Sequence, residues 1–131
     1  MPTTKKSRNL NSIPNPGNSR QQFSDVEILK RRRLDELMNY WNTLRNKDVI
    51  EMLADPSSDE FFGAIVQLAV RDYGVQQNQL AKYLGISPST VGRWADGAAL
   101  PPLYAREKVA AAIADLVELE IRARQESFLL A

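Results

Sequence analysis

Residues 77–97 place the strongest constraint on the fold, because they read as two short helices joined by a tight turn. Gly85 can adopt the positive φ that ends a helix abruptly, and Ser87-Pro88 is a typical N-cap and first helical residue. Apolar residues at helical spacing predict the inner side of this segment: Leu80, Ala81, Leu84, Ile86, Val91 and Trp94. The sequence therefore predicts helices over about 77–84 and 88–95, the second closed by Asp96-Gly97.

The rest of the chain also shows helical spacing, and no segment alternates with the two-residue period of a half-buried strand. Ser24 followed by Glu27 is a capping-box pattern, which predicts a helix over about 24–46. Further helices are expected over about 59–73 and from Pro101 towards the C-terminus. The predicted fold is all-α, a compact helical bundle.

Composition divides the chain into three parts. Residues 1–23 are rich in Pro, Asn and Ser and poor in apolar groups, so we expect a disordered basic arm there. Residues 24–56 are predicted to form an N-terminal helical extension. Residues 57–131 are predicted to form the bundle that contains the two short helices and a long C-terminal helix.

The two-helix segment resembles the repressor/Cro-like helix-turn-helix family, also called the xenobiotic-response-element type. The resemblance spans roughly residues 60–117 and depends on residues that match the family pattern in type and spacing: Gln77, Leu80, Ala81, Leu84, Gly85, Ile86, Ser87, Val91, Trp94, Gly97 and Pro101. It implies a bundle of about five helices that binds operator DNA, usually as a dimer, with the second helix of the pair in the major groove. The resulting hypothesis is a prokaryotic or phage-type transcriptional regulator of the repressor type.

The resemblance also implies which side chains contact DNA. Gln77 would lie near a phosphate, where the helix dipole favours an anion. Ser87 and Ser89 would lie near bases, Ser89 and Thr90 can reach a phosphate or a base edge, and Arg93 is the best base-reading candidate, because a guanidinium can bond both acceptors of guanine. The complete predicted DNA-binding set is Gln77, Lys82, Ser87, Ser89, Thr90, Arg93, Lys30, Arg31, Arg32 and Arg33.

Charge is distributed unevenly along the chain. The 17 basic and 16 acidic residues nearly cancel, but residues 1–47 carry ten basic groups against four acidic ones, a net of +6. The predicted two-helix segment is poor in charge, and Pro88 and Gly92 offer no polar side chain to DNA. We therefore expect the basic arm and the run from Lys30 to Arg33 to neutralise phosphates, with a solvated surface as the alternative interpretation.

The absence of Cys and His excludes several function classes. No disulfide, thiol nucleophile, thiolate or imidazole metal site can form, and the commonest general base is missing, so we expect no enzyme, metal or cofactor. No window approaches the roughly 18 apolar residues of a membrane-spanning helix, and the N-terminal residues are polar rather than signal-like. These features predict a cytoplasmic protein without a membrane partner.

A second interpretation is a protein-binding module, such as an antiactivator, an antitoxin or an adaptor, that uses the helix-turn-helix only as a scaffold. Its partner surface would be one of two apolar sets, unless they pack on the core: Leu34, Leu37, Trp41 and Leu44, or Phe128, Leu129 and Leu130.

Homodimerisation is also expected, through the C-terminal helix or the N-terminal one. The C-terminal helix has an apolar stripe longer than a compact bundle needs: Val109, Ile113, Leu116, Val117 and Ile121. Acidic and basic residues flank this stripe, as they do in helices that pair with other helices.

Overall fold

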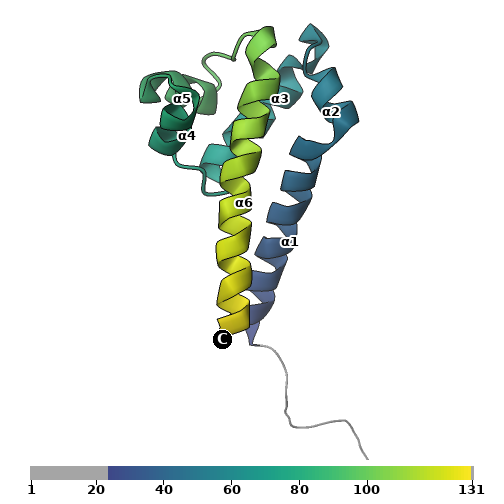
Figure 1. Cartoon of the computed structure of the whole chain (residues 1–131), viewed down its shortest axis with the longest axis vertical. Helices are drawn as coiled ribbons and strands as arrows, with labels where there is room; N and C mark the ends of the chain where they lie inside the picture. Colours follow the sequence, from purple (N-terminus) through teal and green to yellow (C-terminus); the bar gives the residue numbers. More distant parts are fainter. Residues whose placement is uncertain (1–23, 131) are drawn as a thin grey trace, which may run out of the picture. The chain divides into compact units, whose positions relative to one another are not determined.

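The computed structural model describes residues 24–130, and every regular element within that range is a helix (Figure 1). The described residues fall into two parts, 24–33 and 34–130, and the boundary lies within α1. In chain order the elements are α1 (Asp25–Arg45), α2 (Lys47–Met52), the 3-10 helix η3 (Pro56–Ser58), α3 (Asp59–Arg71), α4 (Gln77–Leu84), α5 (Pro88–Ala95), the 3-10 helix η4 (Leu103–Ala105) and α6 (Arg106–Leu130). The predicted all-α bundle is confirmed, while the arm predicted at 1–23 lies outside the described residues.

α1 begins at the predicted capping box. The backbone N–H of Glu27 donates to Ser24 Oγ at 3.2 Å, and the backbone N–H of Ser24 donates to the Glu27 carboxylate at 3.2 Å. α1 ends at Arg45, because Asn46 has an extended backbone and starts a new helix: its side-chain oxygen accepts the Val49 N–H at 3.1 Å. Local side-chain chemistry thus decides both ends of α1.

The core of residues 34–130 draws on every α-helix except α2, and on the loops between them. α1 from residue 34 onward, together with the residue that follows α2, supplies four buried side chains: Leu37, Tyr40, Leu44 and Leu53. The core therefore includes residues from the stretch 24–56, which was predicted as an N-terminal helical extension. Leu34 and Trp41 also pack against this core, so the α1 face considered as a partner surface is occupied within the chain.

α6 contributes the largest share of this core. Its predicted apolar stripe is buried along its whole length: Val109, Ile113, Leu116, Val117 and Ile121. The stripe that suggested dimerisation is therefore used by the chain's own core, and a dimer would need other residues of α6. The helix also starts later than expected, since Pro101 and Pro102 precede η4 and α6 begins at Arg106.

Tyr40 joins α1 to α3. Its hydroxyl donates to the Ile65 carbonyl at 2.7 Å, and its ring centroid lies 4.5 Å from that of Tyr73. Burial, with a smaller effect from Tyr73, raises the pKa of Tyr40 far above its usual value, so the hydroxyl stays protonated and remains a donor.

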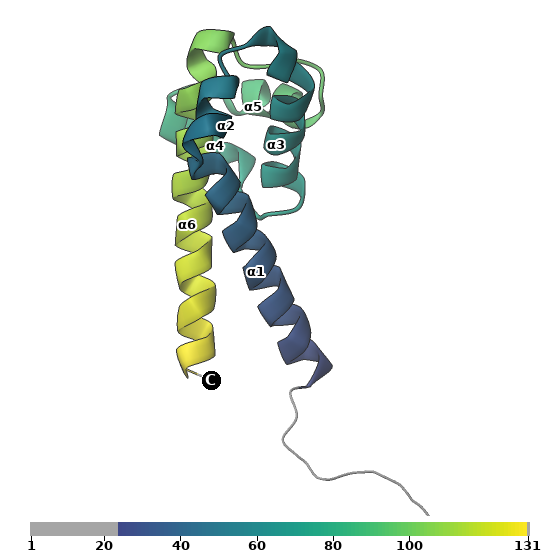
Figure 2. The same ribbon diagram turned by 90° about the vertical axis from the view of Figure 1, so that its right-hand side faces the viewer.

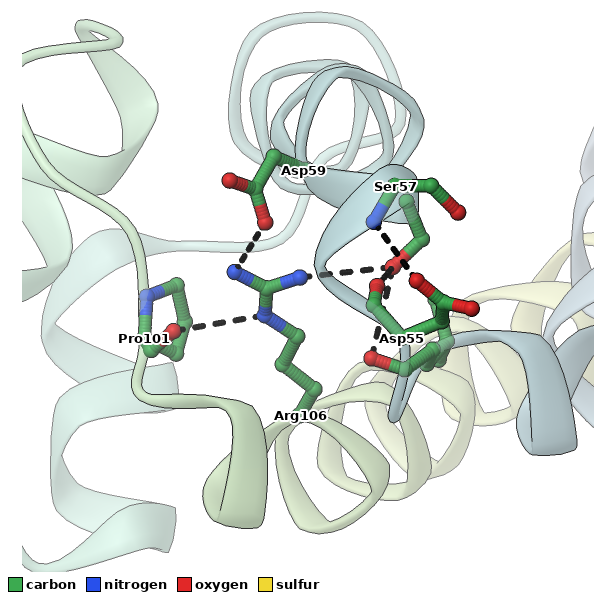
Figure 3. A network of polar contacts seen from close by, with 7 residues as sticks. Asp55, Ser57, Asp59, Pro101 and Arg106 are labelled. Carbon is green, nitrogen blue, oxygen red and sulfur yellow. Dashed lines mark hydrogen bonds and ion pairs between the residues drawn. The ribbon is translucent and has the colours of Figure 1, made fainter.

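Arg106, the first residue of α6, is only 4% exposed, and each of its three guanidinium nitrogens has a polar partner (Figure 3). Nε donates to the Pro101 carbonyl at 3.3 Å, Nη1 donates to Ser58 Oγ at 3.3 Å, and Nη2 lies 2.7 Å from Asp59 Oδ1. The guanidinium carbon also lies 5.6 Å from the centroid of the Phe62 ring. These contacts connect the start of α6 to the start of α3 and to the loop before α6.

Replacing Arg106 with Met is expected to lower the free energy of unfolding by about 2–3 kcal/mol, because it removes several contacts of a buried cation and leaves Ser58 with less hydrogen bonding. Arg71→Met is the matched control, since Arg71 forms a pair with Asp96 at 3.3 Å in which both side chains are mostly exposed. That control should cost less than about 1 kcal/mol. Urea unfolding of both variants measures the difference, and equal losses would contradict a structural role for Arg106.

Candidate functional site

α4 and α5 lie together beside α3 and α6, as Figure 1 and Figure 2 show, and their bounds match the predicted helices. Gly85 ends α4 with a φ of 72°, a conformation that glycine adopts without strain. The Ile86 N–H donates to the Ala81 carbonyl at 3.0 Å and the Gly85 N–H to the Lys82 carbonyl at 3.3 Å, which satisfies the end of α4. The turn between the helices is therefore only three residues long.

The inner side of α5 anchors it to the bundle. Val91 and Trp94 are buried as predicted, and α5 packs against both α3 and α4. The outer side carries Ser89 and Arg93, four residues apart and therefore on the same face of the helix, and both are exposed. The Arg93 guanidinium has no hydrogen bond or ion pair with any residue of the range 24–130. It is therefore available to an external acceptor.

Three hydroxyl groups gather at the N-terminus of α5. Ser87 acts as the predicted N-cap, since its Oγ accepts the Thr90 N–H at 3.3 Å, and Pro88 is the first helical residue. The Ser87 Oγ also lies 3.2 Å from Ser89 Oγ and 2.9 Å from Thr90 Oγ1. Ser87 is thus engaged in capping, while the exposed Ser89 is the hydroxyl best placed to reach a ligand.

Gln77 and Gly92 form a contact that sequence reasoning missed. The Gln77 Nε2 donates to the Pro88 carbonyl at 2.9 Å, so the first residue of α4 is bonded to the first residue of α5. A Cβ atom at Gly92 would lie 2.7 Å from that Nε2, so a side chain at this position requires the Gln77 amide to move. The Gln77 amide has two N–H hydrogens, so one remains for another acceptor.

Few charged side chains lie on or next to α4 and α5. Lys82 is exposed on α4 and forms no ion pair within the described part of the chain. Asp96, the residue after α5, lies 3.3 Å from the exposed guanidinium of Arg71. Tyr83 donates its hydroxyl to Asp115 on α6, and this hydrogen bond raises the pKa of Tyr83. Lys82 and Arg93 are therefore the cations of α4 and α5 that no carboxylate neutralises.

The ten predicted DNA-binding residues fall on two parts of the chain. Six lie on α4, on α5 or at the turn between them: Gln77, Lys82, Ser87, Ser89, Thr90 and Arg93. The other four follow one another in α1, where Lys30, Arg31 and Arg32 are exposed and Arg33 is half-buried. Four consecutive residues of a helix point to different sides, so these cations surround α1 rather than forming one stripe.

Two further properties bear on function. Residues 24–130 contain no group of three or more acidic side chains arranged to bind a metal ion. Within the same range, no helix has both the length and the apolar content that crossing a bilayer requires.

Comparison of the chain with protein-family models, with curated proteins and with solved structures finds no match. A functional assignment therefore depends on the side chains of α4 and α5 and on their geometry.

The contact between Gln77 and Gly92 predicts a coupling between the two positions. Gly92→Ala should gain about 1 kcal/mol from the better helix former and lose about 1 kcal/mol as the Gln77 hydrogen bond breaks, a net change near zero. In a Gln77→Ala background the same substitution should be stabilising by about 1 kcal/mol. Urea unfolding of the four proteins gives the coupling energy, and an identical effect of Gly92→Ala in both backgrounds would contradict the contact.

Proposed function

We propose that the chain is a sequence-specific DNA-binding transcriptional regulator in which α4 and α5 form a helix-turn-helix and α5 enters the major groove. One observation carries this proposal: α5 is fixed from behind by Val91 and Trp94 and presents Ser89 and an unpaired Arg93 on its outer face. A short helix held in this way can be inserted into a groove without reorganising the bundle. The resemblance to repressor/Cro-like proteins supports the same assignment.

Arg93 is the proposed base reader. The major groove, about 12 Å wide, accommodates an α-helix, and an Arg on its outer face can donate two hydrogen bonds to the O6 and N7 acceptors of guanine. An unpaired guanidinium does not have to break an existing ion pair before it binds. Ser89, one turn earlier on the same face, adds a hydroxyl that can reach a phosphate or a base edge.

The N-terminus of α4 is the proposed phosphate contact. No side chain caps this end of α4, so its first N–H groups have no side-chain partner. Gln77 already spans from α4 to α5, and its second amide hydrogen can donate to a phosphate oxygen near those N–H groups. This contact would set the position of α5 on the duplex without reading sequence.

The cations that α4 and α5 lack are proposed to come from the N-terminal part of the chain. Residues 1–47 carry a net charge of +6, and four of these cations are consecutive from Lys30 to Arg33. Their proposed role is to bind phosphates and release counterions, which supplies affinity rather than specificity. The proposal includes a cytoplasmic, prokaryotic or phage repressor type that binds as a homodimer to half-sites about 34 Å apart.

Arg93→Ala should weaken binding by roughly 10- to 100-fold to a duplex that the full chain selects from a random library, and should relax the preference at one base pair. Lys108→Ala is the matched control, because it removes an exposed cation of α6 and should leave the preference intact. Fluorescence anisotropy measures both. Unchanged affinity and preference in Arg93→Ala would remove the proposed reader, and selection of no duplex would contradict DNA reading altogether.

The double variant Lys30→Gln/Arg32→Gln should reduce the slope of log affinity against log salt by about two for the same duplex, since each phosphate contact contributes about 0.9. Sequence preference should not change. Arg71→Gln/Lys108→Gln removes two exposed cations outside residues 1–47 and serves as the control. Equal slopes for the two double variants would show that the cluster in α1 has no special part in binding phosphate.

A further inference from the structure

α6 has a second, outward face beyond the stripe that it buries. A shallow groove follows this face near the end of the helix, and all six residues that line it are exposed: Leu119, Arg122, Ala123, Gln125, Glu126 and Leu129. Leu119 is 59% exposed and Leu129 is 85% exposed, so this face of α6 presents two large apolar side chains to solvent.

The order of residues on this face is nearly symmetric. Leu119, Arg122, Glu126 and Leu129 are separated by steps of three, four and three, so they lie on one side of α6 with the spacing of a helix-pairing seam. Read in either direction, the face presents an apolar residue, two residues of opposite charge and an apolar residue. The midpoint of both the outer and the inner pair is Arg124.

This symmetry makes the face complementary to itself. When two copies of α6 pack antiparallel about Arg124, Leu119 of one copy lies opposite Leu129 of the other, and Arg122 lies opposite Glu126. A parallel arrangement would place Arg122 opposite Arg122 and Glu126 opposite Glu126, which is unfavourable. A two-fold axis produces the antiparallel arrangement, and each contact then occurs twice.

The side chains at the centre of the face are available for such contacts. Arg122 lies 2.5 Å from Glu118 and is 69% exposed, so its guanidinium can donate to a second carboxylate without losing the first. Glu126 has no ion-pair partner within residues 24–130, and Ala123 is small enough for two helices to approach closely.

We infer that a second copy of this chain docks on this groove, with α6 against α6 in antiparallel orientation centred on Arg124. The seam from Leu119 to Leu129 spans about 15 Å of helix, which is short and indicates a reversible dimer. The role of this dimer rests on the proposed function, because a two-fold dimer would present two α5 helices to DNA. Its test measures association without DNA, so the two can fail separately.

The absence of native cysteine makes the register directly testable in the full chain. Leu119→Cys and Leu129→Cys are prepared separately, mixed and oxidised, and disulfide-linked dimers are analysed by mass. The mixture should give the 119–129 heterodimer at least about fivefold above either variant alone, since cross-linking requires Cα atoms within about 7 Å. Ala111→Cys, on an exposed position of α6 away from the groove, gives the background. Self-linking equal to the mixed product, or a mixed product at background, would overturn the antiparallel dimer.

Charge reversal provides a second measurement. Arg122→Glu and Glu126→Arg should each weaken association at least about tenfold in sedimentation equilibrium, because each places like charges opposite one another. The double reversal should restore it. Glu120→Arg/Arg124→Glu reverses a neighbouring ion pair of α6 outside the groove and serves as the control, with circular dichroism to verify folding. Failure of the double reversal to restore association, with folding intact, would overturn the proposed contact.

Discussion

The buried guanidinium of Arg106 is the interaction on which the arrangement of residues 34–130 depends most. A cation with almost no exposure is stable only when its donors are satisfied, and here the partners come from α3, from η3 and from the loop before α6. The starts of α3 and α6 are therefore held in one geometry. Since α5 packs on α3 and α4 packs on α6, this geometry also positions the candidate site.

In the α4–α5 pair, the inner side is attached to the bundle and the outer side is exposed. Buried apolar groups attach its inner side to the bundle, while glycine at two points lets the two helices meet closely: Gly85 permits the short turn, and Gly92 leaves room for Gln77. The hydrogen bond from the Gln77 side chain to the Pro88 carbonyl connects the two helices directly. The outer face is left with few charges, which suits a surface that selects a ligand by hydrogen-bond geometry and obtains its long-range attraction from cations elsewhere in the chain.

α6 has one face buried in the core and another that is exposed. Its buried stripe completes the core, and the turns beyond that core expose apolar groups between opposite charges. The core of residues 34–130 does not cover the whole circumference of this helix, so Leu119 and Leu129 are exposed on it. In the proposed dimer, the same helix would contribute both to the folding of one chain and to the pairing of two.

The sequence by itself determined the local elements. The capping box at Ser24, the cap at Ser87 and the helix end at Gly85 involve residues within five positions of one another, so the bounds of α4 and α5 and the start of α1 could be predicted. Only the tertiary structure decided which cation is buried, which side chain lies against Gly92 and which face of α6 remains exposed. Those answers depend on contacts between residues 11 to 48 positions apart, such as Gln77 with Pro88 and Ser58 with Arg106, and helical periodicity carries no information about such pairs.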